Sequence, residues 1–264
     1  MKRLLTCLFL LISLHGYSQK IHLFFLADPE DSRGVKDRTE MENFWRYVGP
    51  YLDYPVTTQT AYSRRELLAK LRATPILAGK DIVVFYFSGR GEAASDRVWP
   101  IMKLKSGDET PSRDVMEIVR PRKAHLTLVI ADCDNQPEPV YVARLIPRPH
   151  PPALRESSQK FFLGNAECKK MFIKIASASV GQRAMRDKNG NSVFLGAFLA
   201  AMKEQMAEPD PRWGLNRLAN TVKSSLIDKV ITQSNGMQKP RFAVDCPADV
   251  DDDEGDVASD TSQN

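Results

Sequence analysis

The sequence predicts an α/β domain of three layers, α/β/α, with a mainly parallel central sheet. Segments 21–27, 81–87 and 125–131 are apolar runs rich in β-branched and aromatic residues, as in strands that are buried on both faces. Segments of helical periodicity separate these runs. Such alternation is typical of right-handed crossovers and of a parallel sheet with helices on both sides. About 230 residues suit one domain of this kind.

The first half of the chain alternates strand and helix. The first strand ends at the turn sequence Asp28-Pro29-Glu30-Asp31, and the next segment carries apolar residues on one helical face. Ser63 begins a later helix, because Glu66 three residues on completes a capping box. We therefore expect strands at 21–27 and 56–60 and helices at 35–48 and 63–73.

Two buried strands end in polar sequences that predict a site. The segment 81–91 ends in Ser88-Gly89-Arg90-Gly91, where two glycines predict a sharp turn and close approach to a ligand. The strand 125–131 continues into Asp132-Cys133-Asp134-Asn135. Because open α/β sheets bind ligands at the carboxyl ends of their strands, the two ends are expected to form one cleft.

The second half predicts further elements around a long loop. A helix is expected from Pro111, and six prolines lie in the loop 136–170, which is either functional or disordered by its length. A strand at 171–178 and helices at 193–206 and 213–231 follow. The last segment is acidic and poor in apolar residues, which predicts disorder.

Three motifs resemble those of the caspase-like cysteine peptidases, a family that includes the metacaspases. They are the strand followed by SGRG, the strand followed by DCDN, and SASVGQRA followed by a glycine turn and VFLGAFLAAM. The resemblance spans residues 21–231. It implies a caspase-like fold, with a histidine as general base in Ser-Gly-His-Gly and a cysteine as nucleophile in Asp-x-Cys. This chain has Arg90 and Asp134 at those positions.

These substitutions remove the chemistry of a thiol peptidase. A guanidinium does not accept a proton near neutrality, and a carboxylate is a poor nucleophile toward an amide. The backbone N–H groups of Gly91 and Asp134 remain as candidate donors of an oxyanion hole. We therefore expect a pseudopeptidase that binds a peptide or protein in the strand-end cleft, or that regulates a related active enzyme. The alternative is an active cysteine endopeptidase that uses Cys133 or an unrecognised arrangement.

The substitute groups are poorly placed for catalysis. Cys133 is adjacent to Asp134 on an extended strand, so its sulfur is expected to point to the opposite face, into the core. His22 and His125 lie at the far ends of their strands, and His150 lies in the proline-rich loop. We predict instead that Arg90 and Asp134 form an ion pair in the catalytic slot, since an arginine fork fits a carboxylate. The alternative is that both side chains are independently solvated.

The remaining candidate residues concern ligand binding. The resemblance implies that Asp132 lines an acidic pocket for basic side chains, but Arg186 stands where a second acid is expected. The pocket is then expected to lose its preference for lysine or arginine. Asp28, by its place at a strand end, is a further candidate, although a role in the turn is the stronger interpretation. The strand ends add four residues to the predicted binding set: Ser88, Cys133, Asn135 and Ser179.

The N-terminus predicts export. Lys2 and Arg3 precede an apolar run too short to span a bilayer, so residues 1–18 are interpreted as a signal peptide and the protein as periplasmic or secreted. The expected divisions are a domain at 19–245 and an acidic tail at 246–264. The resemblance implies possible maturation cleavage in the loop 136–170, at Arg148, Arg155 or Lys160; an uncut surface loop is the alternative.

Composition argues against several partners. Cys133, Cys168 and Cys246 are widely spaced, which fits neither a metal ligand set nor a disulfide framework. A single bridge with a spare thiol is the alternative, and we expect no cofactor. The formal net charge is +4, yet basic residues are scattered, which disfavours nucleic-acid binding. No membrane association is expected after signal removal. The tail carries seven acids between residues 249 and 260 without the spacing of a Ca²⁺ loop, so partner docking is a further interpretation.

Overall fold

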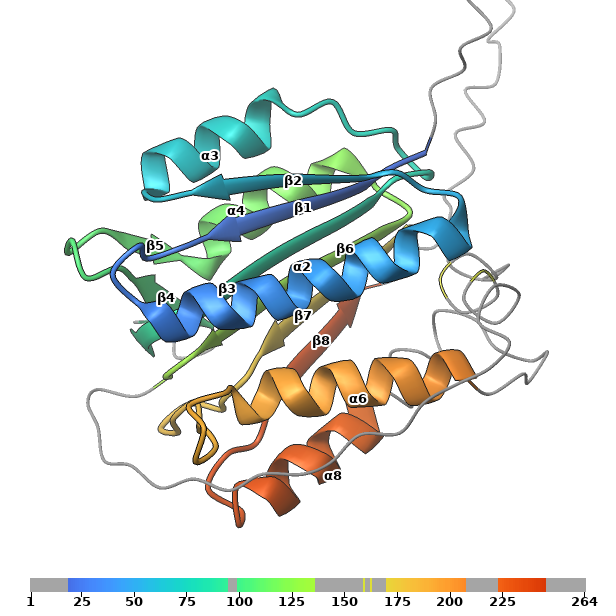
Figure 1. Ribbon diagram of the computed structural model, residues 1–264. Helices are drawn as coiled ribbons and strands as arrows, with labels where there is room; N and C mark the ends of the chain where they lie inside the picture. Colours follow the sequence, from blue (N-terminus) through green and yellow to red (C-terminus); the bar gives the residue numbers. More distant parts are fainter. Residues whose placement is uncertain are drawn as a thin grey trace, which may run out of the picture.

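The computed structural model describes residues 19–94, 99–135, 159, 162, 170–207 and 223–245, which are built around an eight-stranded sheet (Figure 1). The main strands follow the order β2-β1-β3-β6-β7-β8, and all neighbours except β7 and β8 are parallel. The strands are β1 (Ile21–Leu26), β2 (Val56–Ala61), β3 (Ile82–Ala93), β4 (Pro100–Lys103), β5 (Glu109–Pro111), β6 (Leu126–Cys133), β7 (Met171–Ala176) and β8 (Arg241–Asp245).

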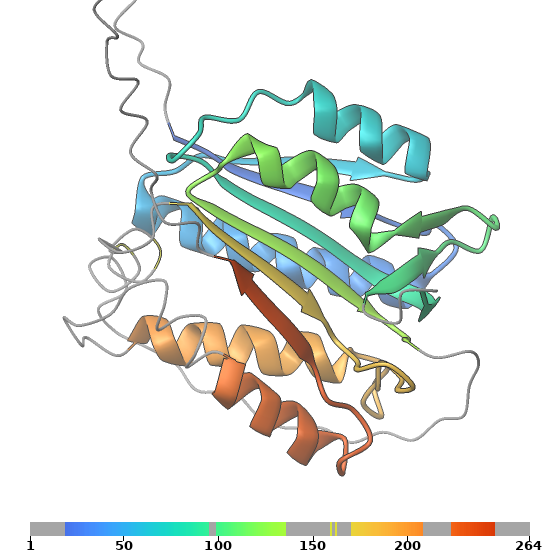
Figure 2. The same ribbon diagram turned by 180° about the vertical axis from the view of Figure 1, so that it is seen from behind.

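Helices cover both faces of the sheet, which confirms the predicted three layers. One face packs against α2 (Ser32–Leu52), α6 (Val193–Ala207) and α8 (Lys223–Gln233), as Figure 1 shows. The opposite face, seen in Figure 2, packs against α3 (Arg64–Ala73) and α4 (Ser112–Val119), which leads into a short 3-10 turn, Arg120–Arg122.

Strand β3 shows why the central strands are continuous apolar runs. Val84 and Tyr86 belong to the core beneath α2 and α6, whereas Val83, Phe85 and Phe87 belong to the core beneath α3 and α4. Because successive side chains of a strand alternate between its faces, a strand with a core on each side needs apolar residues at every position.

Most predicted elements are present, with shifted ends. Helix α2 is longer than expected at both ends; Asp31 accepts the N–H of Arg33 at its start, and Pro50 lies inside its last turn. The capping box of α3 is offset, because Ser63 accepts the N–H of Glu66 while Glu66 accepts that of Tyr62. The predicted helix at 213–231 is described only over Lys223–Gln233. Strands β4, β5 and β8 were not predicted.

The sharp turn predicted at Gly89 and Gly91 is wrong. Strand β3 continues to Ala93, and its last four residues leave the parallel sheet to pair antiparallel with β4. Gly91 is required because a larger residue would not fit here. Its Cβ would lie 2.4 Å from the Asp134 carbonyl oxygen and 2.5 Å from the Cys133 Sγ. Two extended segments can therefore approach closely at this edge of the sheet.

Several predictions fall outside the described residues: the signal peptide, nearly all of the loop 136–170 with His150, and the acidic tail. Export, maturation cleavage and the states of Cys168 and Cys246 therefore stay predictions. Within the described parts of the chain, none of the helices combines the length and apolar character needed to cross a bilayer.

Candidate functional site

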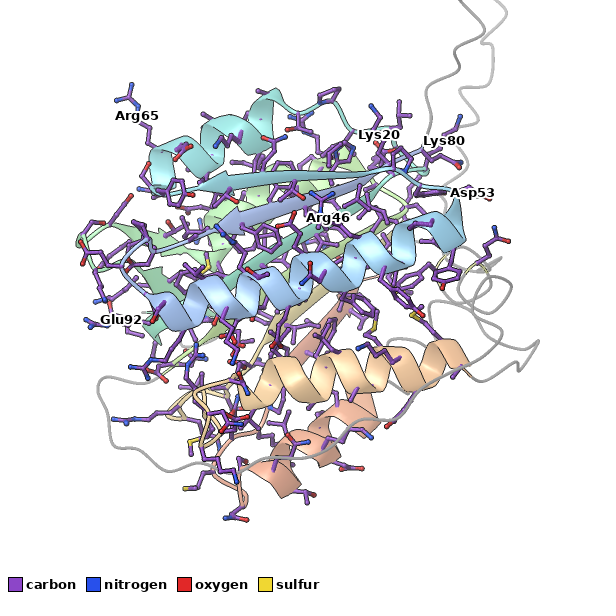
Figure 3. The ribbon with its side chains drawn as sticks, viewed as in Figure 1. Lys20, Arg46, Asp53, Arg65, Lys80 and Glu92 are labelled. Carbon is purple, nitrogen blue, oxygen red and sulfur yellow. The ribbon has the colours of Figure 1, made fainter. Side chains whose placement is uncertain are left out.

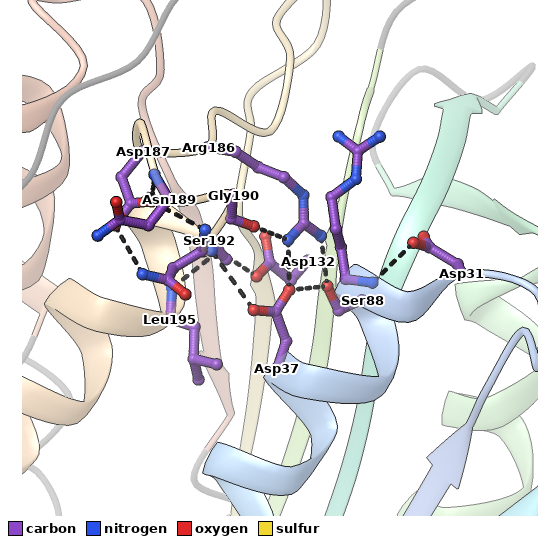
Figure 4. Close-up of polar contacts among 12 residues, drawn as sticks. Asp31, Asp37, Ser88, Asp132, Arg186, Asp187, Asn189, Gly190, Ser192 and Leu195 are labelled. Carbon is purple, nitrogen blue, oxygen red and sulfur yellow. Dashed lines mark hydrogen bonds and ion pairs between the residues drawn. The ribbon is translucent and has the colours of Figure 1, made fainter.

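The predicted strand ends do meet at the carboxyl edge of the sheet. Ser88 on β3 lies opposite Asp132 on β6, and Gly89 lies opposite Cys133. The first turn of α2 packs directly on this edge, since a Cβ at Gly34 would lie 2.6 Å from the Ser88 carbonyl oxygen. The segment between β7 and α6 closes the edge from the other side (Figure 4).

A buried ion pair forms the centre of this edge. The Arg186 guanidinium lies 2.8 Å from a carboxylate oxygen of Asp37 on α2, and the Asp37 side chain is only 1% exposed. Arg186 also donates to the Ser88 Oγ at 3.0 Å and to the Gly190 carbonyl oxygen at 3.0 Å. The Ser88 hydroxyl in turn donates to Asp37 at 2.6 Å. The arginine fork is therefore satisfied by a carboxylate, a hydroxyl and a carbonyl (Figure 4).

Asp132 is the second carboxylate of the cluster. Its Oδ2 accepts the Ser192 hydroxyl at 2.5 Å and the Tyr86 hydroxyl at 3.2 Å, while its Oδ1 is buried without a hydrogen bond from any described residue. Burial, and then the neighbouring Asp37 carboxylate, raise the pKa of Asp132 to about 6, although Arg186 and Ser192 oppose the shift. The cluster therefore has a carboxyl group that titrates near physiological pH.

These contacts define a buried polar cluster, called the acidic slot below, which consists of Asp37, Ser88, Asp132, Ser192 and Arg186. Sequence reasoning placed Asp132 in an acidic pocket and noted Arg186 in place of a second acid. A second buried acid near Asp132 comes from α2, as Asp37. Arg186 contacts Asp37 directly, and its charge also opposes the rise in the pKa of Asp132.

The predicted ion pair between Arg90 and Asp134 is wrong. Neither a hydrogen bond nor an ion pair joins these two described residues, and Arg90 is exposed. Pairing of β3 with β6 ends at Gly89, one residue before Arg90 would lie opposite Asp134, and β3 then diverges to pair with β4.

Asp134 has another partner. Its carboxylate accepts the backbone N–H of Ala184 at 2.9 Å. Burial raises the pKa of Asp134 from its usual value, and the Ala184 N–H together with the nearby Arg183 and Arg186 opposes the shift. The carboxylate therefore anchors the segment between β7 and α6.

Cys133 faces away from the slot, as predicted. It is fully buried among the residues beneath α3 and α4, whereas Asp132 bonds Tyr86 on the opposite face. Burial, and next the charge of Asp132, hold the pKa of the Cys133 thiol well above its usual value. Gly91 lies against both Cys133 and Asp134, so the predicted oxyanion positions are adjacent; their role as donors stays a prediction.

The other predicted binding residues have structural partners. Asp28 accepts the backbone N–H groups of Glu30 and Lys105, which fits the predicted turn role. Asn135 is buried; it donates to the Ala178 carbonyl oxygen and forms an isolated bridge to Gln182. Ser179 donates to the Lys239 carbonyl oxygen. These three residues hold loops around the edge.

The described histidines lie at the opposite edge. His22 contacts the Asp81 carboxylate at 3.0 Å and the Thr57 hydroxyl at 3.1 Å, near the start of β1. His125 contacts the Phe162 carbonyl oxygen at 2.8 Å, just before β6. No described imidazole is therefore near Asp134 or Cys133. Nor do the described histidines, cysteines and acids form any group of three suited to a metal ion.

Sequence reasoning missed Asp37, Tyr86 and Ser192. Asp37 carried a signal: it lies four residues before Met41 on the apolar stripe of α2, where an acid needs a buried partner. Ser192 precedes the first residue of α6 and accepts the N–H of Leu195 three residues on, the pattern of a helix cap.

Comparison with protein families adds an independent finding. Residues 29–250, which include all of these strand ends, match the caspase domain family of peptidases, C14. No curated protein sequence matches the chain significantly.

Proposed function

Because this chain belongs to the caspase domain family, we propose that it is a member without peptidase activity that binds a peptide or protein at the carboxyl edge of its sheet. The observation that carries the proposal is the state of the residues at the ends of β3 and β6. They offer an arginine, a carboxylate that is hydrogen-bonded to backbone, and a buried thiol.

None of the described residues places an imidazole at this edge. Cysteine peptidase chemistry needs an imidazole or an equivalent group that takes a proton from the thiol and returns it to the leaving amine. A guanidinium is not a general base, and the described histidines lie at the amino ends of their strands. Neither Arg90 nor these histidines can therefore supply the proton transfer.

The thiol is also unsuitable. The nucleophile of such a reaction is the thiolate, and it must reach the substrate carbonyl carbon. Cys133 is buried beneath α3 and α4, and its pKa is raised because burial disfavours the charged form. A reaction at this sulfur would require the core on that face to open.

The filled slot restricts the ligand. A basic side chain that approached Asp37 and Asp132 would meet Arg186, which already satisfies Asp37 and Ser88. A ligand is therefore expected to bind over the surface of the edge, where the exposed Arg90 lies, and not to insert an arginine or lysine into the slot.

Binding and cleavage can be tested together. The purified protein is incubated with a diverse peptide library, and the retained peptides are identified by mass spectrometry after gel filtration. We expect the retained peptides to be intact. We also expect Arg90→Glu to weaken their retention about tenfold, which corresponds to 1.4 kcal/mol of binding free energy. The matched control is Lys80→Glu, an equal charge reversal at the opposite end of the sheet (Figure 3).

The outcomes separate the alternatives. Cleaved peptides in the retained or released fraction would contradict the proposed lack of activity. Equal retention by the wild type and the Arg90→Glu variant, or equal losses with Lys80→Glu, would contradict binding at this edge.

A further inference from the structure

A cationic face lies on the side of the sheet that α3 and α4 cover only in part. It consists of Arg120, Lys174 and Arg241 around the Trp99 ring. The Lys174 Nζ lies 5.2 Å from the centre of that ring and the Arg241 Cζ lies 5.9 Å from it. Both distances are those of cation–π contacts, which hold the two cations beside one aromatic side chain.

The strand register brings these cations together. Lys174 on β7 lies opposite Ala243 on β8, and Ala176 lies opposite Arg241, so the two cations share one face. Phe172, two residues before Lys174, lies beneath α4 and under the Arg120 guanidinium, which fixes this as the α3 and α4 side. Figure 2 shows β7 and β8 extending beyond the edge of α4 on this side.

The positive charge of this face exceeds its negative charge. Arg120 pairs with Asp245, but Lys174 and Arg241 have no carboxylate within ion-pair distance among the described residues. Burial, and then the nearby Arg120, lower the pKa of Lys174. The face therefore favours an anionic group that would compensate these two cations.

The chain itself carries an acidic segment shortly after β8 in the sequence. The acidic segment, residues 249–260, contains seven acids and begins four residues after Asp245, the last residue of β8. Asp245 is held at the face by Arg120. An extended chain advances about 3.3 Å per residue, so a few residues suffice to turn back from Asp245 to Lys174. A tethered segment this close has a high effective concentration.

We propose that the acidic segment 249–260 docks on the cationic face of the same molecule, with its carboxylates beside Lys174 and Arg241. This inference does not depend on the proposed function, because the cationic face and the acidic slot are separate residue sets on opposite faces of the sheet.

Carbodiimide cross-linking of the full chain tests this docking. The reagent condenses a carboxylate with an amine in contact, and Lys174 is the single amine of the cationic face. We expect peptides that join Lys174 to residues 249–260, formed within monomers and suppressed by high salt, which screens the attraction. Lys80, exposed at the amino edge of the sheet, is the reference and is expected to yield few such products.

Two variants control the result. Arg241→Glu leaves the Lys174 amine in place but is expected to reduce its cross-links about tenfold, a loss of 1.4 kcal/mol in docking free energy. A full-length variant with the seven acids changed to Asn or Gln serves as the receptor for a synthetic peptide of residues 246–264. We expect it to bind this peptide more tightly than the wild type does, because the wild-type tail competes.

Three results would overturn the proposal. They are tail cross-links spread equally over Lys174 and Lys80, cross-links confined to dimers, and equal peptide affinity for the wild type and the neutralised variant.

Discussion

Two sets, each of one arginine and one aspartate, lie at the same edge of the sheet, and only one of them forms an ion pair. In the acidic slot, Arg186 and Asp37 form an ion pair, although they are far apart in the sequence. Where β3 and β6 stop pairing, Arg90 and Asp134 lie one register step beyond the last paired residues, and neither a hydrogen bond nor an ion pair joins them. The difference follows burial: the Asp37 side chain is 1% exposed, whereas Arg90 is at the surface.

Burial explains why one set pairs and the other does not. A carboxylate removed from water costs several kcal/mol in general unless a cation and hydrogen bonds compensate it. An exposed arginine gains at most about 1 kcal/mol from pairing, and it also loses side-chain freedom. The fold therefore needs the Arg186 contact and does not need the one predicted for Arg90.

The largest effect is expected from breaking the buried pair. Arg186→Met leaves Asp37 buried without its cation, which should lower the free energy of unfolding by about 3–5 kcal/mol. Asp37→Asn combined with Arg186→Met should recover much of the loss, because the uncompensated charge is removed. Urea denaturation of the two single variants and the double variant measures the loss of unfolding free energy and its recovery. A loss below about 1 kcal/mol for Arg186→Met would remove the distinction between the two sets.

A smaller effect is expected from pH. The pKa of Asp132 is raised from 3.8 to about 6, so the folded state binds this proton more tightly than the unfolded state does. The contribution of Asp132 to the free energy of unfolding is fully present below pH 3.8 and is lost as pH rises through about 6. The change amounts to about 3 kcal/mol. The difference in unfolding free energy between the wild type and Asp132→Asn isolates this term from other groups. A difference that stays constant across this pH range would contradict the assignment.

The smallest effect is expected at Arg90. Arg90→Ala should change the free energy of unfolding by less than about 0.5 kcal/mol, because the exposed side chain has no ion-pair partner among the described residues. A double-mutant cycle with Asp134→Asn should give a coupling energy near zero. Measurable coupling would show that the two charges interact in solution.

The sequence predicts the strands best where burial alone decides which residues they contain. Strands β1, β3, β6 and β7 were predicted because burial on two faces demands unbroken apolar runs. Strand β8 was missed because its residues are half-buried or exposed and produce no such run. Strands β4 and β5 are too short, at four and three residues, to carry a pattern.

Only those residues of the candidate site that follow apolar strands were located from the sequence. Ser88 and Asp132 were placed correctly, since they follow strands that the apolar pattern located. Their partners Asp37 and Arg186 come from a helix and a loop far away in the sequence, and tertiary packing alone brings them together. Conversely, the Arg90 pairing failed because the register ended one residue early, where β3 turns to β4.

Peptide turnover by the wild-type protein and by Cys133→Ala tests the proposed lack of peptidase activity most directly. A broad library of labelled peptides is incubated with each protein at equal concentration, and new termini are counted by mass spectrometry. The account predicts no cleavage above background by either protein, since Cys133 is buried and its thiol pKa is raised. Cleavage by the wild type that disappears in Cys133→Ala would contradict it.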